Sequence, residues 1–226
     1  MSKYASSDHT KGLLINAAGE LAAELGFSNV STRAVAERSG ENIGSIHYHF
    51  GGKDPLFEAV VNEAIQDIRT FSALDVMNSI GEEKMSPENI SSVIEAVVHQ
   101  HICALFDPDK PHWHSQVIYQ LLQTEGALYE LFASKVMKPD MEAMQKLFRL
   151  IKPEMSDDDI VLHTLILNMP IFSHASYMST ILRLLDTSAY SDEYLKKLED
   201  LLVCQTQLLF DLPLTGNKIV KEKKES

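Results

Sequence analysis

Residues 31–53 read STRAVAERSGENIGSIHYHFGGK, and this stretch decides which fold the sequence predicts. Ser31 and Asn42 are candidate N-caps, because their side-chain oxygens can accept a hydrogen bond from the first turn of a following helix. Gly40 lies between the two predicted helices, where the chain needs a left-handed residue to leave the first one. Two short helices joined by such a turn form a helix-turn-helix, whose second helix can enter the major groove of DNA.

The exposed face of the second helix predicts the DNA contacts. We expect small, hydrogen-bonding and aromatic residues on this face, namely Gly44, Ser45, His47, Tyr48 and His49. Such groups suit base edges and phosphates, and a glycine allows the backbone to approach the duplex closely. For His47 and His49, packing between helices at the back of the motif is an alternative interpretation.

The same segment resembles the TetR family of bacterial transcriptional regulators. In that family the pattern T-x-R-x-I-A-x-x-A-G-V-S-x-G-T-L-Y-x-Y-F-x-x-K spans helices two to four. The matching positions here are Ser31, Arg33, Val35, Ala36, Gly40, Gly44, Ser45, Ile46, Phe50 and Lys53. The run ENIGSIHYHFGGKDPLF is most similar to the CecR-like subgroup. His47 stands where the family usually has tyrosine, and Glu41 where an apolar residue is usual.

The resemblance implies an all-α fold with a three-helix helix-turn-helix head and a larger helical domain for ligand binding and dimerisation. We expect a DNA-binding domain at 1–53, a ligand-binding and dimerisation domain at 54–213, and a disordered tail at 214–226. The two last large helices, near 157–185 and 192–209, would pair with those of a second copy. Their apolar stripes could instead close the core of the monomer.

The implied function is a ligand-responsive regulator, most simply a repressor that binds a palindromic double-stranded DNA operator as a homodimer. Arg33 and Lys53 would hold phosphates, and Asn42 would cap the recognition helix. A small-molecule effector would bind among helices of the body and release the DNA. Candidate lining residues are Phe71, Phe106, Trp113, Tyr119, Met144, Phe172 and Met178, an aromatic and Met-rich set that suits an apolar or amphipathic compound. Ordinary core packing is the alternative for each of them.

Charge along the chain bears on the DNA partner. The 226 residues carry a net charge of -12. Within 1–53 the cations and acids cancel, since Lys3, Lys11, Arg33, Arg38 and Lys53 are matched by Asp8, Glu20, Glu24, Glu37 and Glu41. A neutral head on an acidic body predicts few phosphate contacts per subunit, so that a dimer is needed. The same charge distribution is compatible with an alternative function, a helical dimeric adaptor or binding protein that does not read a specific operator. The acidic body favours a cationic or neutral effector over an anion.

Further helices are predicted almost throughout, with no convincing strand. The first runs near Thr10–Leu25, and a long fourth helix carries Leu56, Val60, Ala64 and Ile68. Later helices are expected at 87–106, 113–123, 128–137, 139–151, 157–185 with a kink at Pro170, and from about 191 to 209. No apolar run is long enough for a membrane span, and no signal peptide is recognisable, so we expect a cytoplasmic protein without a membrane partner.

Neither an enzyme nor a metal protein is predicted. The chain has no P-loop, G-x-S-x-G or H-E-x-x-H motif, and we expect no cofactor. His99, His101, His112 and His114 could together bind zinc. However, His99 and His101 would lie about 200° apart on a helix, which disfavours a shared metal ion. Cys103 and Cys204 are expected to be buried, reduced thiols.

Overall fold

The computed structural model describes residues 3–66, 73–81 and 85–215, and within these ranges every regular element is a helix. The chain forms two compact units. Residues 1–69 and 108–136 make up the first, and residues 70–107 and 137–226 the second. None of the described helices is both long enough and apolar enough to cross a membrane. The all-α fold with a helix-turn-helix near the N-terminus is therefore confirmed.

The first unit is built around the N-terminal helix. Its helices are α1 (Lys3–Leu25), α2 (Thr32–Ser39), α3 (Ile43–Phe50), α4 (Lys53–Ala64), α8 (Trp113–Leu121) and α9 (Ala127–Phe132), with the 3-10 turn η1 (Phe27–Asn29) after α1. Leu14, Val35, Ile46 and Leu56 are almost completely buried and come from four successive helices. Because these apolar faces pack on one another, the exposed face of α3 is held outward.

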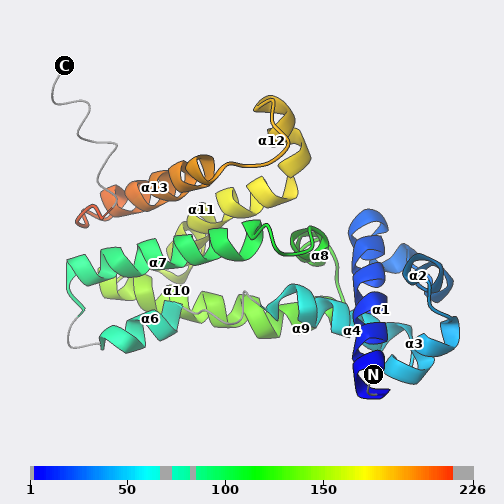
Figure 1. Ribbon diagram of the computed structural model, residues 1–226. Helices are drawn as coiled ribbons and strands as arrows, with labels where there is room; N and C mark the ends of the chain where they lie inside the picture. Colours follow the sequence, from blue (N-terminus) through cyan, green and yellow to red (C-terminus); the bar gives the residue numbers. More distant parts are fainter. Residues whose placement is uncertain (1–2, 67–72, 82–84, 216–226) are drawn as a thin grey trace. The chain divides into compact units, whose positions relative to one another are not determined.

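The second unit is a stack of helices. Its elements are α6 (Ala73–Ile80), α7 (Pro87–Phe106), α10 (Lys138–Ile151), α11 (Asp157–Ser176), α12 (Met178–Leu184) and α13 (Asp192–Leu209). A π-helical segment, Ala133–Met137, precedes α10. In Figure 1, α7 lies beside α13 and α11, and α10 lies beside α11. Ser86, Ser156 and Ser191 cap α7, α11 and α13, since each hydroxyl oxygen accepts a backbone N–H from the first turn.

Some predicted helices have other bounds. The helix predicted at 157–185 is divided at Tyr177 into α11 and α12, and Pro170, where a kink is predicted, lies inside α11. A proline removes only one N–H, and the helix continues through it until Tyr177 takes φ -100° and ψ 22°. Helix α6 was not expected as a separate element, and α4 ends at Ala64. Ile68 lies outside the described residues.

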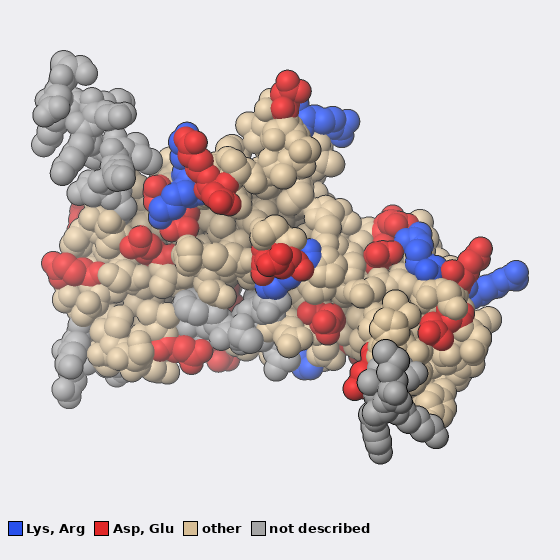
Figure 2. Space-filling view, viewed as in Figure 1, with Lys and Arg blue, Asp and Glu red and all other residues tan. Residues whose placement is uncertain are grey.

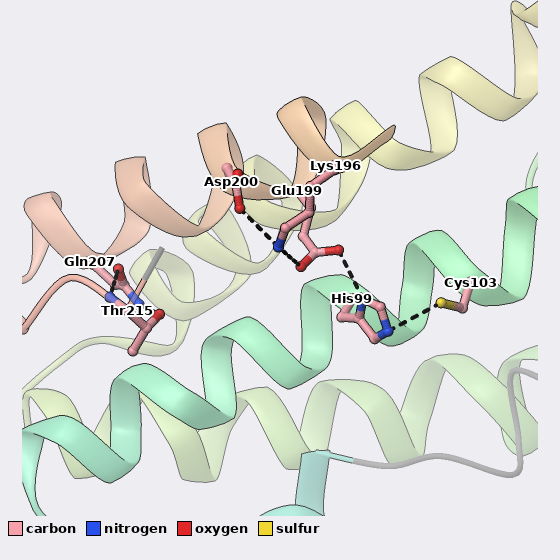
Figure 3. Close-up of polar contacts among 7 residues, drawn as sticks. All are labelled: His99, Cys103, Lys196, Glu199, Asp200, Gln207 and Thr215. Carbon is pink, nitrogen blue, oxygen red and sulfur yellow. Dashed lines mark hydrogen bonds and ion pairs between the residues drawn. The ribbon is translucent and has the colours of Figure 1, made fainter. Parts of the chain in front are cut away.

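The end of the described chain is attached to the second unit. The Gln207 side-chain oxygen accepts a hydrogen bond from the Thr215 N–H at 3.2 Å, and its amide nitrogen donates to the Thr215 hydroxyl at 2.7 Å (Figure 3). Ser91 Oγ donates to the Pro213 carbonyl at 2.7 Å. The tail predicted at 214–226 falls outside the described residues from position 216 onward.

Candidate nucleic-acid interface

The helix-turn-helix has the capping geometry that the sequence predicts. Ser31 Oγ accepts a hydrogen bond from the Ala34 N–H at 3.1 Å, and Asn42 Oδ1 accepts one from the Ser45 N–H at 2.9 Å. Gly40 ends α2 with φ 74°, in the left-handed region. These local contacts fix where the recognition helix α3 begins and the direction in which it leaves the turn.

Helix α3 presents a polar and aromatic face to solvent. Tyr48 is 82% exposed, whereas Ile46 is fully buried against the rest of the unit. His47 is exposed, and the half-buried His49 packs edge-on against the Tyr48 ring with 4.9 Å between ring centroids. This contact holds the orientation of Tyr48 while its hydroxyl points to solvent.

Ile43 is an exposed residue that the sequence pattern does not identify. Its apolar character and its spacing to Ile46 suggest an inward position, yet its side chain is 43% exposed. The signal that could have revealed it is its place directly after the N-cap, in the first helical position, where no preceding turn covers it. An exposed apolar group here can contact a thymine methyl group.

Gly44 has a local structural role. A Cβ atom at residue 44 would lie 2.9 Å from Asn42 Oδ1, the atom that caps α3. Such a contact is closer than real Cβ atoms tolerate, so the capping side chain would have to move. The absence of a side chain at this position therefore protects the cap and leaves the backbone open on the outer face.

Glu41 is tied to its surroundings. One of its carboxylate oxygens accepts a hydrogen bond from Thr10 Oγ1 at 3.2 Å, and the other accepts one from Ser45 Oγ at 3.4 Å. The residue thus links the turn to α1, which explains how a carboxylate is accommodated there. Its negative charge lies beside the start of the recognition helix.

The cations of the head differ in what surrounds them. Arg38 Nη1 lies 3.0 Å from Glu24 Oε1 and 3.3 Å from Glu20 Oε2, and the hydrogen bonds that the guanidinium donates to Glu24 and then to Glu20 raise its pKa. Its charge is therefore balanced within the head. Lys53 Nζ lies 5.3 Å from the centroid of the Phe57 ring, at the start of α4. Arg33 is exposed on α2.

The visible surface of the head agrees with this charge balance. Figure 2 shows acidic and basic side chains interspersed over the head, without a continuous basic patch on the face that is drawn. Within the motif, Arg33 lies on α2 and Lys53 is the first residue of α4.

The residues predicted to line an effector site do not all lie in one compact unit. Phe106, Met144, Phe172 and Met178 belong to the second unit, whereas Trp113 and Tyr119 belong to the first. Phe71 lies outside the described residues. Trp113 is 4% exposed, and its indole N–H donates to Asn16 Oδ1 at 3.3 Å.

A polar group is enclosed between three helices of the second unit. His101 on α7 lies 3.9 Å from Asp140 on α10, measured from Nε2 to Oδ1, and Asn168 on α11 donates to Asp140 Oδ2 at 3.4 Å. His101 Nδ1 and Asn168 Oδ1 are buried and have no hydrogen-bond partner among the described residues. Buried polar atoms are normally paired, so these two are open for a further partner.

Burial changes the protonation of this polar group. It raises the pKa of the Asp140 carboxyl above its ordinary value, and the positive charge of a protonated His101 opposes the rise. It lowers the pKa of His101, and Asp140 and Asn168 oppose the fall. The sequence suggests His101 only as a metal ligand. Asp140 and Asn168 were missed, although each precedes a predicted lining residue, Met144 or Phe172, by one helical turn.

The predicted metal alternative finds no geometric support. Among the residues that the structure describes, no group of three histidine, cysteine or acidic side chains is arranged to hold a metal ion.

Helices α11 and α13 expose apolar side chains. On α11 these are Val161, Leu162, Leu165, Ile166 and Met169, each between 39% and 62% exposed. On α13, Leu198 and Leu202 of the predicted stripe are buried, whereas Leu209 is 59% exposed and is joined by Leu201 and Leu208. Each helix therefore has one face in the core of the unit and a second apolar face toward solvent.

Part of the chain is similar in sequence to known proteins. Residues 14–60 match the family model described as bacterial regulatory proteins, tetR family. The HTH-type transcriptional regulator SrpR of Pseudomonas putida is 26% identical over 125 residues, which cover 55% of this chain and 53% of that protein. The chain thus aligns with about half the length of this curated relative.

Solved structures share the fold over nearly the whole chain. The SmeT–triclosan complex has a TM-score of 0.58 and 14% identity, and covers 94% of this chain and 99% of its own. A transcriptional regulator from Rhodococcus sp. Rha1 has a TM-score of 0.57 and 19% identity, with 88% and 96% covered. At such identities the similarity concerns the fold alone. Residues 14–60, which contain the capped helix-turn-helix, thus match the N-terminal domain of the bacterial tetR regulatory family.

Proposed function

We propose that this protein is a ligand-responsive DNA-binding transcriptional regulator, and most simply a repressor that binds a palindromic operator as a homodimer. The observation that carries the proposal is the geometry of helix α3. Asn42 caps its N-terminus, Gly51 ends it in the left-handed conformation, and Tyr48 on its surface is 82% exposed. We further propose the CecR-like subgroup, and this proposal is supported by the resemblance of the run ENIGSIHYHFGGKDPLF. An enzymatic role has no support from the motif or from the relatives, which are regulators.

The DNA contacts are proposed from the position of each side chain. Arg33 and Lys53 contact phosphates, and Asn42 caps α3 so that its first N–H groups face the duplex. The reading face comprises Gly44, Ser45, His47, Tyr48 and His49, to which the structure adds the exposed Ile43. Tyr48 and Ser45 are the side chains through which sequence is read, since Tyr48 is exposed to solvent and Ser45 is half-exposed in the first turn of the helix.

Dimerisation supplies the second recognition helix. The exposed apolar faces of α11 and α13, centred on Ile166 and Leu208 at 62% and 60% exposed, are the proposed contact with a second copy. Clusters of this kind are unfavourable in water and mark an interaction surface. A symmetric dimer doubles the few phosphate contacts of one head and matches a palindromic site.

The effector site is proposed beside His101, Asp140 and Asn168. Two buried atoms of this group are open: Asn168 Oδ1 and His101 Nδ1, and both are acceptors when His101 Nε2 carries the proton. A compound that donates hydrogen bonds and carries a positive charge would satisfy them. Met144 and Phe172 lie one helical turn away and would contact its apolar part, with Phe106 and Met178 as further candidates in the same unit. The proposed effector is a cationic amphipathic compound.

The test is selection of genomic fragments by the purified protein. Recovery of one palindromic sequence, bound by two chains, would support the regulator. Weak binding to every fragment, lost near physiological salt, would contradict it and favour the dimeric adaptor. A protein that fails to select DNA by itself should also be tested after addition of cationic amphiphiles, since an effector can favour the DNA-bound state.

A further inference from the structure

A thiol, an imidazole and a buried carboxylate are connected in series where α7 and α13 pack together. Cys103 Sγ lies 3.4 Å from His99 Nε2, and His99 Nδ1 lies 2.9 Å from Glu199 Oε2. Figure 3 shows the three side chains in this order, with His99 and Cys103 one turn apart on α7 and Glu199 reaching from α13. Cys103 is exposed rather than buried as predicted, and it forms no disulfide.

Glu199 determines which ring nitrogen of His99 carries the proton. The Glu199 side chain is only 6% exposed, and Lys196 Nζ lies 2.8 Å from its other oxygen, Oε1. Burial favours the neutral acid, but the hydrogen bonds from Lys196 and His99 outweigh it and lower the pKa of Glu199. The carboxylate therefore accepts the Nδ1–H of His99. In neutral His99 the Nε2 lone pair then faces the thiol of Cys103.

This order of groups is the one that activates a nucleophile. A base within reach of the thiol takes its proton, and a third group fixes the tautomer and stabilises the imidazolium that forms. The thiolate is the reactive form of cysteine. An exposed thiol beside such a base has a larger thiolate fraction near neutral pH than an isolated thiol.

A surface depression leads to the same place. It has a volume of about 450 Å³ and is lined by Ser92, Glu95, Ala96, His99, Lys196 and Glu199. Its four residues from α7 follow helical spacing, and Cys103 continues the same face one turn beyond His99. A compound seated in the depression therefore has an end within reach of the thiol.

We propose that Cys103 is a modification site for soft electrophiles, with α,β-unsaturated carbonyl compounds as the chemical class. The Cys103 proton moves to His99 Nε2, and the sulfur forms a bond to the β-carbon of the electrophile. The electron pair of the carbon–carbon double bond moves toward the carbonyl to give an enolate. The enolate takes a proton back from the imidazolium, so that the product is a thioether and no oxidant is needed. This chemistry belongs to the thiol itself and does not depend on DNA binding.

Cys204 provides a matched control in the same unit. It is partly buried on α13, and the described contacts place no imidazole beside it. A reaction governed by exposure of any thiol would modify both cysteines at related rates. A reaction governed by the base next to the sulfur is specific to Cys103.

The experiment is reaction of the full chain with limiting N-ethylmaleimide, followed by intact mass and peptide mapping. We expect one adduct on Cys103 at the wild-type rate in Cys204→Ser and no fast adduct in Cys103→Ser. Substitution His99→Gln should slow the reaction at neutral pH by about a hundredfold, the lower end of the effect of a positioned base. Because the His99 side chain is 59% exposed, this variant is expected to fold.

The pH profile separates activation from a structural effect. In the wild type the rate constant should reach its plateau at lower pH than in His99→Gln, and both proteins should react equally fast well above the ordinary pKa of a thiol. Equal rates for Cys103 and Cys204, or identical pH profiles for the wild type and His99→Gln, would overturn the proposal. If His99→Gln proved unfolded by circular dichroism, the wild-type profile alone would decide, since an ordinary thiol inflection near pH 8.5 contradicts activation.

Discussion

Gly19 of α1 lies directly against the indole ring of Trp113. A Cβ atom at residue 19 would come within 2.5 Å of two ring carbons, and the indole N–H is hydrogen-bonded to Asn16, one turn earlier on α1. Helix α8 is therefore held against the helix that supports the helix-turn-helix by a contact that leaves no room for a methyl group. Trp113 is a structural link within the first unit, whatever else it contacts.

Replacing Gly19 with alanine should destabilise the first unit. The methyl group must displace a buried indole, and overpacking of this kind costs about 1–3 kcal/mol. Urea denaturation followed by tryptophan fluorescence measures the effect, since Trp113 is the one tryptophan of the chain. The control is Gly12→Ala, also on α1, where a Cβ meets nothing within 4 Å. Gain of helix propensity should stabilise that variant slightly, and equal effects of the two changes would contradict the packing argument.

Loss of the Asn42 cap should weaken both stability and DNA binding. Asn42→Ala removes the acceptor for the Ser45 N–H, a change that costs about 0.5–2 kcal/mol. Asn42→Ser retains a capping oxygen and serves as the control. Gly44→Ala should act in the same direction, because its Cβ would crowd the capping atom at 2.9 Å. Thermal unfolding and operator affinity are the measurements, and an unchanged melting temperature in Asn42→Ala would count against the role of the cap.

A charge on the exposed face of α11 should separate the proposed dimer. Ile166→Glu places a carboxylate where 62% of the side chain is exposed in the single chain, so the monomer should fold normally. In the dimer the same charge would be buried without a partner, which is strongly unfavourable. Sedimentation equilibrium measures the association. Leu25→Glu, at a 49% exposed apolar position on α1, is the control, and a dimer that tolerates Ile166→Glu would exclude this face.

Asp140→Asn should stabilise the protein while it weakens effector binding. Because burial raises the pKa of Asp140, its contribution to stability is complete below the unfolded-state value of about 3.9 and is lost as the pH rises through the folded-state value. The asparagine cannot ionise, so the stability advantage of the variant should grow as the pH rises from the unfolded-state pKa of Asp140 through its raised folded-state pKa. Urea denaturation over a series of pH values tests this. A constant difference would show that the carboxyl is not perturbed.

The same variant tests the effector proposal. Loss of the carboxylate should lower the affinity for cationic amphiphiles and leave operator binding in the absence of effector intact. If DNA binding persists while the variant and the wild type bind the same amphiphiles equally well, the site beside Asp140 is wrong and the regulator proposal survives. If neither protein binds DNA, the regulator proposal itself fails.

Local signals in the sequence predict the DNA-binding motif well. Ser31, Gly40 and Asn42 act through hydrogen bonds and backbone angles within a few residues, so that their roles can be read from spacing alone. The position of Ile43 at the helix start is also local, but its apolar character suggests the opposite face. Periodicity predicts most helices, whereas it does not predict the interruption at Tyr177.

Contacts between distant segments could not be predicted in this way. His101, Asp140 and Asn168 come from three helices, and only the packing of the second unit brings them together. The contact between Cys103 and His99 is local, because the two residues lie one turn apart on α7. The contact between His99 and Glu199 depends on where α13 packs. Such groups appear in the sequence only as single polar residues on apolar helices.

The central claim is that α3 reads a specific operator while Lys53 holds the backbone. Titration of the wild type, Tyr48→Ala and Lys53→Ala with the selected palindrome and a scrambled duplex, over a salt series, tests it most directly. Lys53→Ala should weaken binding to both duplexes alike and reduce the slope of log affinity against log salt concentration by about one per subunit. Tyr48→Ala should instead reduce the preference for the palindrome. Equal wild-type affinity for the two duplexes, or a uniform loss in both variants, would contradict the account.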